Sequence, residues 1–232
     1  GAPLAAIQLG AGKKDQAERI LGNSLALLLM TAAVLTVGFS AFKEPILRAF
    51  GASDATIGYA SSYIGIYLLG TVFVMTTLGL NPYINSQGFA RTGMLTVLLG
   101  AVANIILDPI LIFGLGLGVR GAAIATVLSQ LLSAVWVMAF LTGPKAELRL
   151  VLKGFRPDVG IIKRILALGT SSFVMGFTDS LVQVACNSTL QAFGGDLYVG
   201  VMTIINSLRE VFMMPIHGLS NGAQPVTGYN YG

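Results

Sequence analysis

One carboxylate lies in the middle of a long apolar run and is the residue best suited to chemistry. Asp179 is fourteen residues from each end of Ile165–Phe193, about 21 Å along a helix from either end. A carboxylate near the middle of a bilayer is costly, and its charge depends on water access and on neighbouring cations. We interpret Asp179 as a site for H⁺ or Na⁺. The structural alternative is a buried salt bridge or a hydrogen bond to a neighbouring helix.

The next apolar run, Val199–Tyr229, carries further charged and polar side chains. If this run enters the membrane at Val199, Arg209 lies about 15 Å deep, at a depth comparable with that of Asp179 in an antiparallel neighbour. Arg209 has two possible partners. They are Asp179 on the other helix and Glu210, whose side chain is rotated by about 100° from that of Arg209 around the helix axis. The other candidates either line a cavity or serve only in hydrogen bonding and packing between helices. These residues are Gln183, Asn187, Asn206 and Met214.

Other motifs have structural interpretations. Asp108-Pro109 lies close to the Gly114–Gly118 turn, which favours capping or packing at a helix kink. The segment Gly116–Gly121 matches G-x-G-x-x-G, but it follows an apolar run and lacks an acidic residue for a ribose. The sequence contains no G-x-S-x-G, H-E-x-x-H or Walker loop, and its single Cys and single His exclude multi-cysteine and His-cluster metal sites. We therefore expect no catalytic residue, no metal and no cofactor.

The composition limits which elements can position these residues. Hydrophobic residues make up 54% of the 232 positions, charged residues only 10%, and the mean hydropathy is +0.78. A soluble domain carries about a quarter charged residues, so this chain cannot cover a globule in water. The net charge of +4 fits loops that face an anionic membrane surface better than a nucleic-acid partner. The composition predicts a membrane protein.

Six apolar stretches approach or exceed the roughly 20 residues that a helix needs to cross a bilayer. Barrel strands would give short alternating segments, whereas these runs are long. We therefore predict an all-α polytopic transmembrane bundle. The predicted spans are Leu21–Phe42, Ile57–Leu80, Thr92–Gly118, Gly121–Leu141, Ile165–Phe193 and Val199–Tyr229.

The basic residues predict the orientation of the bundle. Ten lie on one side of the spans and three on the other, which assigns the ten to the cytoplasm. The ten are Lys13, Lys14, Arg19, Arg91, Lys145, Arg149, Lys153, Arg156, Lys163 and Arg164; the three are Lys43, Arg48 and Arg120. The polar segment Gly143–Arg164 is interpreted either as a linker between two helical lobes or as an ordinary cytoplasmic loop.

Two short motifs near the ends of the sequence have the same spacing. Gly10 lies seven residues after the proline of Gly1-Ala2-Pro3, and Gly232 lies seven residues after the proline of Ala223-Gln224-Pro225. Six spans lie between them, as expected for a transporter with two parallel halves; chance similarity is the alternative. The stretch Asn104–Gln130, with its L-D-P and Gly-rich turn, resembles the multidrug and toxic compound extrusion (MATE) family. The phrases Gly10–Asp15 and Gly222–Gly232 resemble it too.

The resemblance implies a fold of twelve helices in two six-helix lobes around a central cavity. This chain would hold the end of helix 2 through helix 8. Residues 1–142 would then belong to the N-terminal lobe, residues 143–164 would form the cytoplasmic interlobe linker, and residues 165–232 would begin the C-terminal lobe. By the same resemblance Asp179 falls at an acidic cation-binding position of helix 7, and Asn206 at a polar position of helix 8.

The function implied is secondary active export of cationic or amphipathic drug-like compounds in exchange for H⁺ or Na⁺, by alternating access. The alternative is a flippase for a lipid-linked precursor, which would need several cationic residues in its cavity, whereas only Arg209 lies deep in a span. We expect a multi-pass protein of the cell membrane, monomeric when full length, with the bilayer and small molecules as partners. No nucleic acid is expected.

Overall fold

The computed structural model describes residues 1–151 and 157–231, and every regular element in them is a helix. Lys153 and Arg156, counted above among the cytoplasmic basic residues, lie outside the described residues. The all-α prediction is confirmed. The elements are α1 (Ala2–Gly10), α2 (Lys14–Ala41), α3 (Lys43–Ala49), α4 (Ile57–Leu69), α5 (Thr71–Ser86), α6 (Ala90–Pro109), the π-helical turn η1 (Ile110–Gly114), α7 (Gly118–Thr142) and α8 (Val159–Tyr231).

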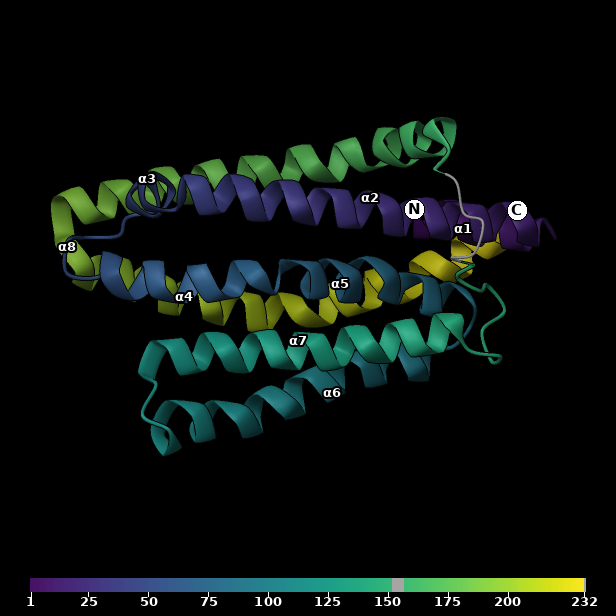
Figure 1. Cartoon of the computed structure of the whole chain (residues 1–232). Coiled ribbons are helices and arrows are strands. Elements are labelled where there is room, and N and C mark those ends of the chain that lie inside the picture. Colours follow the sequence, from purple (N-terminus) through teal and green to yellow (C-terminus); the bar gives the residue numbers. More distant parts are fainter. Residues whose placement is uncertain (152–156, 232) are drawn as a thin grey trace.

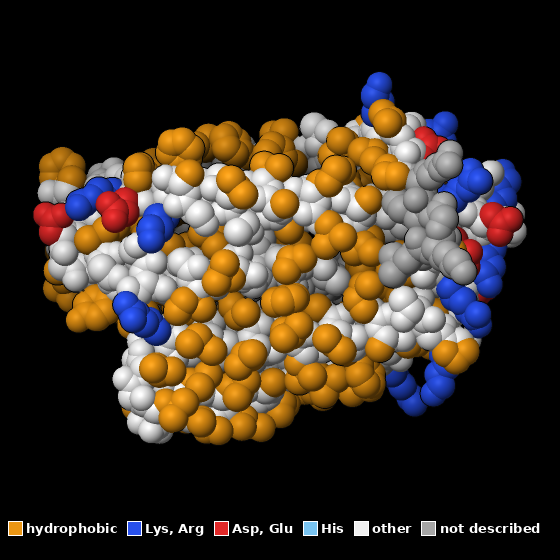
Figure 2. Space-filling view, viewed as in Figure 1, with side chains coloured by type: hydrophobic (Ala, Val, Ile, Leu, Met, Phe, Trp, Pro, Cys, Tyr) orange, Lys and Arg blue, Asp and Glu red, His pale blue; other side chains and the backbone are white. Residues whose placement is uncertain are grey.

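The longer helices lie roughly parallel or antiparallel in one elongated bundle, and the short α3 lies across them (Figure 1). Among the described residues, α2, α6 with η1, α7 and α8 are each long and apolar enough to cross a membrane. Helices α4 and α5 reach that length and hydropathy only when taken together as one bent pair. Apolar side chains cover the middle of the visible face, and Lys and Arg gather mainly at the end that holds both termini (Figure 2). This asymmetry matches the distribution of charge along the sequence.

The 73-residue helix α8 consists of two helices joined at a sharp turn. The backbone leaves helical geometry at Gly195, where φ is 64° and ψ is −165°. A positive φ costs glycine little, whereas most other residues would be strained there. The first half of α8 runs away from the termini and the second half returns (Figure 1). The two halves correspond to the fifth and sixth predicted spans.

The second predicted span is broken rather than straight. Helices α4 and α5 meet at Gly70 with a bend of 57°. A Cβ atom on Gly70 would lie 2.6 Å from Cγ2 of Val127 on α7, so the missing side chain allows a close approach. The hydroxyl of Thr36 donates to the carbonyl oxygen of Leu68 at 3.1 Å, which satisfies a group near the end of α4.

A buried core joins α1, α2, α5 and α7 near the end that holds the termini. Leu21, Leu80, Ile84 and Val137 are fully buried there. The buried hydroxyl of Tyr83 hydrogen-bonds Oγ of Ser24, which links α5 to α2. This core is the frame against which the two ends of α8 pack.

Candidate functional site

The polar residues predicted on α8 lie along both of its halves. Asp179 and Gln183 are exposed on the first half, one helical turn apart. Asn187 is half-buried, as is Asn206 on the returning half. Met214 is 64% exposed and so does not pack into the core of the described residues.

Of the two partners considered for Arg209, the structure brings Glu210 closer. Nη2 of Arg209 lies 3.7 Å from Oε1 of Glu210, and both side chains are more than half exposed. Within the described ranges, no ion pair joins Arg209 to Asp179. The Asp179 carboxylate is therefore not neutralised by a basic side chain of these residues, and it is exposed to whatever occupies the space beside α8.

Helix α8 contacts the rest of the bundle near its central turn and at its C-terminal end. Near its turn, Oγ of Ser53 donates to Oδ2 of Asp196 at 2.9 Å, and Oγ of Ser188 donates to the carbonyl oxygen of Ala49 at 2.7 Å. Asp196 thus lies at the same end as the segment between α2 and α4, as the predicted topology requires. This polar contact connects the turn of α8 to that segment.

The C-terminal end of α8 packs closely on α1. A Cβ atom on Gly10 would lie 2.1 Å from the carbonyl oxygen of Tyr229, and one on Gly228 would lie 3.2 Å from Cβ of Ala6. Both motifs with the shared spacing therefore meet at one helix interface. The contact depends on glycines that let two backbones approach each other.

A second candidate for chemistry lies on α6. Nδ2 of Asn104 and Oδ1 of Asp108 are both buried, and neither has a hydrogen-bond partner among the described residues. The two residues are one turn apart and share a helix face. Capping by Asp108 is not seen in the described part of the chain: α6 continues through Pro109 into η1, and Oδ1 of Asp108 has no hydrogen-bond partner there. Buried polar atoms without a protein partner are candidates for binding an ion or water.

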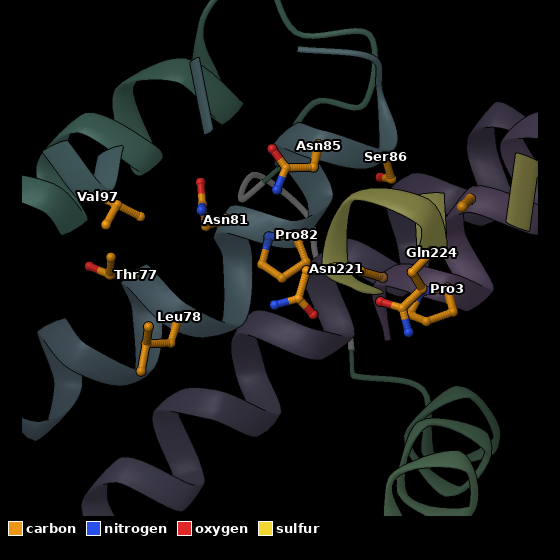
Figure 3. Close-up of a pocket in the computed structure, with 12 residues that line it drawn as sticks. Pro3, Thr77, Leu78, Asn81, Pro82, Asn85, Ser86, Val97, Asn221 and Gln224 are labelled. Carbon is orange, nitrogen blue, oxygen red and sulfur yellow. The ribbon is translucent and has the colours of Figure 1, made fainter. Parts of the chain in front are cut away.

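Amide side chains line a cavity of about 390 Å³ between α1, α5, α6 and the end of α8. Figure 3 shows Asn81 and Asn85 on α5, one turn apart, with Asn221 and Gln224 of α8 nearby. Oδ1 of Asn81 is buried and has no partner within the described part of the chain. The cavity offers hydrogen-bonding groups and no charged side chain among its lining residues.

Gly93 on α6 packs closely against two of the amide side chains that line this cavity. A Cβ atom on Gly93 would lie 2.0 Å from Oδ1 of Asn85 and 3.3 Å from Oδ1 of Asn81. Both amide oxygens therefore face the same small residue. Neither Asn81 nor Asn85 was expected from the sequence. A usable signal was present, because two Asn four residues apart flank a proline in an otherwise apolar run.

Comparison with known proteins identifies the family. The MatE family model matches residues 1–110. A solved structure of the MATE multidrug transporter DinF-BH, in complex with a ligand, is 36% identical, with a TM-score of 0.95, and the match covers 100% of this chain and 52% of the other. The chain belongs to the MATE family. The resemblance inferred from the sequence is confirmed.

Two further comparisons place this MATE chain among its relatives. It is 28% identical over 225 residues to the multidrug export protein MepA of Staphylococcus haemolyticus, which covers 96% of this chain and 49% of that protein. A MATE family transporter solved in an outward-facing conformation is 29% identical, with a TM-score of 0.85, and covers 99% of this chain and 51% of the other. This MATE chain thus spans about half the length of the relatives it matches.

The comparisons also confirm coarser expectations. The named relatives are exporters and transporters rather than enzymes, which agrees with the prediction that this MATE chain is not an enzyme. The apolar helices and these relatives together show a multi-pass membrane protein.

Proposed function

We propose that the protein is a secondary active exporter of cationic and amphipathic compounds, driven by exchange for H⁺ or Na⁺. The observation that carries the proposal is a pair of carboxylates, Asp108 and Asp179, in membrane-spanning helices. Neither forms an ion pair within residues 1–151 and 157–231. A carboxylate at membrane depth is costly, and it is retained where its charge has a use.

The names of relatives support the class of substrate. MepA is named a multidrug export protein, and DinF-BH is described as a multidrug transporter. Exposed apolar side chains on α8, including Leu181 and Val182 beside Asp179, suit the apolar part of such compounds. A drug cation and the coupling ion would compete for the same negative charge, so that binding of one releases the other.

The way α8 is attached suits alternating access. Its turn is tied to Ser53 and Ala49 by two hydrogen bonds, and its far end packs on α1 through Gly10. The hydrogen bonds near the turn are exposed, so that contact can open while the closer packing against α1 holds. We propose that these two contacts open in turn. The proposal includes the cell membrane as location, a monomer as the working unit, and no cofactor besides the coupling ion.

The alternative, a flippase for a lipid-linked precursor, finds less support. Binding a pyrophosphate calls for several cationic side chains, because each phosphate oxygen needs a charged or hydrogen-bonding partner. Arg209 is the one Lys or Arg deep in the predicted spans, and its Nη2 lies 3.7 Å from Glu210. An anionic headgroup would therefore meet a guanidinium that already has a carboxylate beside it.

Efflux of a fluorescent cation from cells tests the proposal. Asp179→Asn and Asp108→Asn keep the shape of each side chain and remove its charge, and Asp54→Asn does the same in the exposed segment that precedes α4. We expect at least one of the first two to abolish efflux at unchanged membrane abundance, and the Asp54 variant to retain it. Ionophores that dissipate the H⁺ or the Na⁺ gradient selectively then identify the coupling ion.

The same assay can refute the proposal. If both intramembrane variants export at the wild-type rate with the same dependence on the gradients, neither carboxylate couples transport. If wild-type cells show no gradient-dependent efflux of cations at all, the exporter function itself is wrong.

A further inference from the structure

A small basic pocket lies where α1, α2 and the start of α8 meet. Its volume is about 230 Å³. Two arginines and two glutamines stand among apolar side chains. The lining residues are Leu4 and Gln8 of α1, Gln16, Arg19 and Ile20 of α2, and Ile161 and Arg164 of α8. The pocket is separate from the intramembrane carboxylates and from the amide-lined cavity.

Both arginines stand at the boundary between polar and apolar sequence. Arg19 precedes the apolar run that begins at Leu21 by two residues, and Arg164 directly precedes the run that begins at Ile165. Both side chains are exposed. The predicted topology assigns this end to the cytoplasm, so the guanidinium groups lie at the depth of the lipid headgroups of the cytoplasmic leaflet.

The guanidinium groups have no anionic partner within the described parts of the chain. Asp15 and Glu18 on α2 and Asp158 before α8 are nearby in sequence, and among the described residues none of them forms an ion pair with either arginine. Oδ1 of Asp158 accepts from the backbone N–H groups of Gly160 at 2.8 Å and Ile161 at 3.3 Å, at the start of α8. Oε1 of Glu18 accepts from the backbone N–H of Arg149 at 3.1 Å. Two positive charges therefore remain available to an external anion.

The frame of the pocket is fixed by a side chain that joins two of its helices. Oδ1 of Asn23 accepts from the backbone N–H of Asp158 at 2.7 Å, and its Nδ2 donates to the carbonyl oxygen of Arg19 at 2.8 Å. Below this bridge, Ile20 and Ile165 are buried in the core. The two arginines are therefore held by packed elements rather than by a loop.

One more group points to the occupant. Oε1 of Gln8 is buried and has no hydrogen-bond partner among the described residues. An acceptor in that position can be satisfied by a hydroxyl of a ligand whose phosphate lies between the arginines. Leu4, Ile20 and Ile161 supply the apolar surface along which an acyl chain can lie.

We propose that this pocket binds one anionic phospholipid of the cytoplasmic leaflet, with its phosphate between Arg19 and Arg164 and a headgroup hydroxyl at Gln8. Phosphatidylglycerol has this chemistry: one negative charge and free hydroxyls. Basic pockets between helices at the cytoplasmic side are suited to such headgroups, because their positive charge attracts the phosphate and they lie at the depth of the headgroup layer.

Native mass spectrometry of the detergent-solubilised protein tests the site, using phosphatidylglycerol and phosphatidylcholine with identical acyl chains. We expect wild type to bind one phosphatidylglycerol more tightly than phosphatidylcholine. Arg19→Gln with Arg164→Gln should weaken phosphatidylglycerol binding by about 30-fold, or about fivefold for each arginine. Arg91→Gln removes an exposed charge at the start of α6, outside the pocket, and should leave the affinity unchanged.

Four outcomes would overturn the proposal. The first two are equal binding of the two lipids by the wild-type protein, and wild-type affinity for phosphatidylglycerol in the double arginine variant. The third is an equal loss of affinity in the Arg91 variant, which would mean diffuse electrostatic attraction. The fourth is binding of inorganic phosphate by a lipid-free sample without preference for phosphatidylglycerol, which would mean a free-anion site. A charge-retaining variant, Arg19→Lys with Arg164→Lys, should keep most of the affinity, which separates loss of charge from loss of folding.

Discussion

The interface between α1 and the end of α8 depends on Gly10 having no side chain. A Cβ atom there would lie 2.1 Å from the carbonyl oxygen of Tyr229 and 3.0 Å from its carbonyl carbon. Both are backbone atoms, so no change of rotamer relieves the clash. Restoring an ordinary contact of 3.4 Å to the oxygen requires the two helices to separate by about 1.3 Å in Gly10→Ala.

The energetic effect follows from two opposing contributions. Overpacking of this kind costs about 1–3 kcal/mol. Alanine is favoured over glycine in a helix by about 1 kcal/mol, which offsets part of that cost because Gly10 has no positive φ. The closed contact is therefore destabilised by up to about 2 kcal/mol, which corresponds to about a 30-fold shift toward separation of α1 from α8.

Spin-label distances measure this separation. Cys186 is the single cysteine, so Cys186→Ser gives a clean background for labels at the exposed positions Lys14 and Asn230. We expect Gly10→Ala to lengthen and broaden the distance distribution. Gly222→Ala, also near the end of α8 but with open space around its Cβ position, should leave it unchanged. If the two variants give superimposable distributions, the close contact does not exist in the membrane and the reasoning fails.

Two further predictions concern stability in detergent. Tyr83→Phe removes the hydroxyl that bonds buried Ser24, and we expect a loss of about 1 kcal/mol in the free energy of unfolding. A double-mutant cycle with Ser24→Ala checks this, since strictly additive losses would contradict the hydrogen bond. Gly121→Ala would place Cβ 2.6 Å from the carbonyl oxygen of Leu111, so we expect a Tm lower by about 5 °C. Gly169→Ala, whose Cβ position is open, should not lower Tm, and an equal fall in both variants would refute the packing argument.

The positions of the spans could be predicted because hydropathy alone determines them. The bend at Gly70 could not, since Ile57–Leu80 carries no charge that would mark a break and Gly70 packs against Val127 on a helix distant in sequence. The short helix α3 was missed for a related reason: its seven residues carry charges and give no membrane signal. Features that arise from contacts between helices leave little trace in a local window of sequence.

The candidate site shows the same division. Asp108 and Asp179 stand out as charges in apolar runs, so their presence could be inferred from the sequence. Which of their oxygen atoms is buried depends on neighbouring helices. The sequence therefore indicated capping or packing at a kink for Asp108, and could not show that its Oδ1 is buried without a partner among the described residues. Similarly, sequence left Arg209 with two partners, and only coordinates distinguish an adjacent carboxylate from one on another helix.

The break at Gly70 has a consequence for how the protein enters the membrane. Helix α4 has 13 residues and α5 has 16, and neither reaches the roughly 20 residues that cross the hydrocarbon alone. Where the pair crosses the bilayer, both helices must enter it together as a single segment. Val127, against which Gly70 packs, is synthesised only afterwards, with α7. The span thus enters the bilayer before its bend can be stabilised, and α7 fixes that shape late in biogenesis.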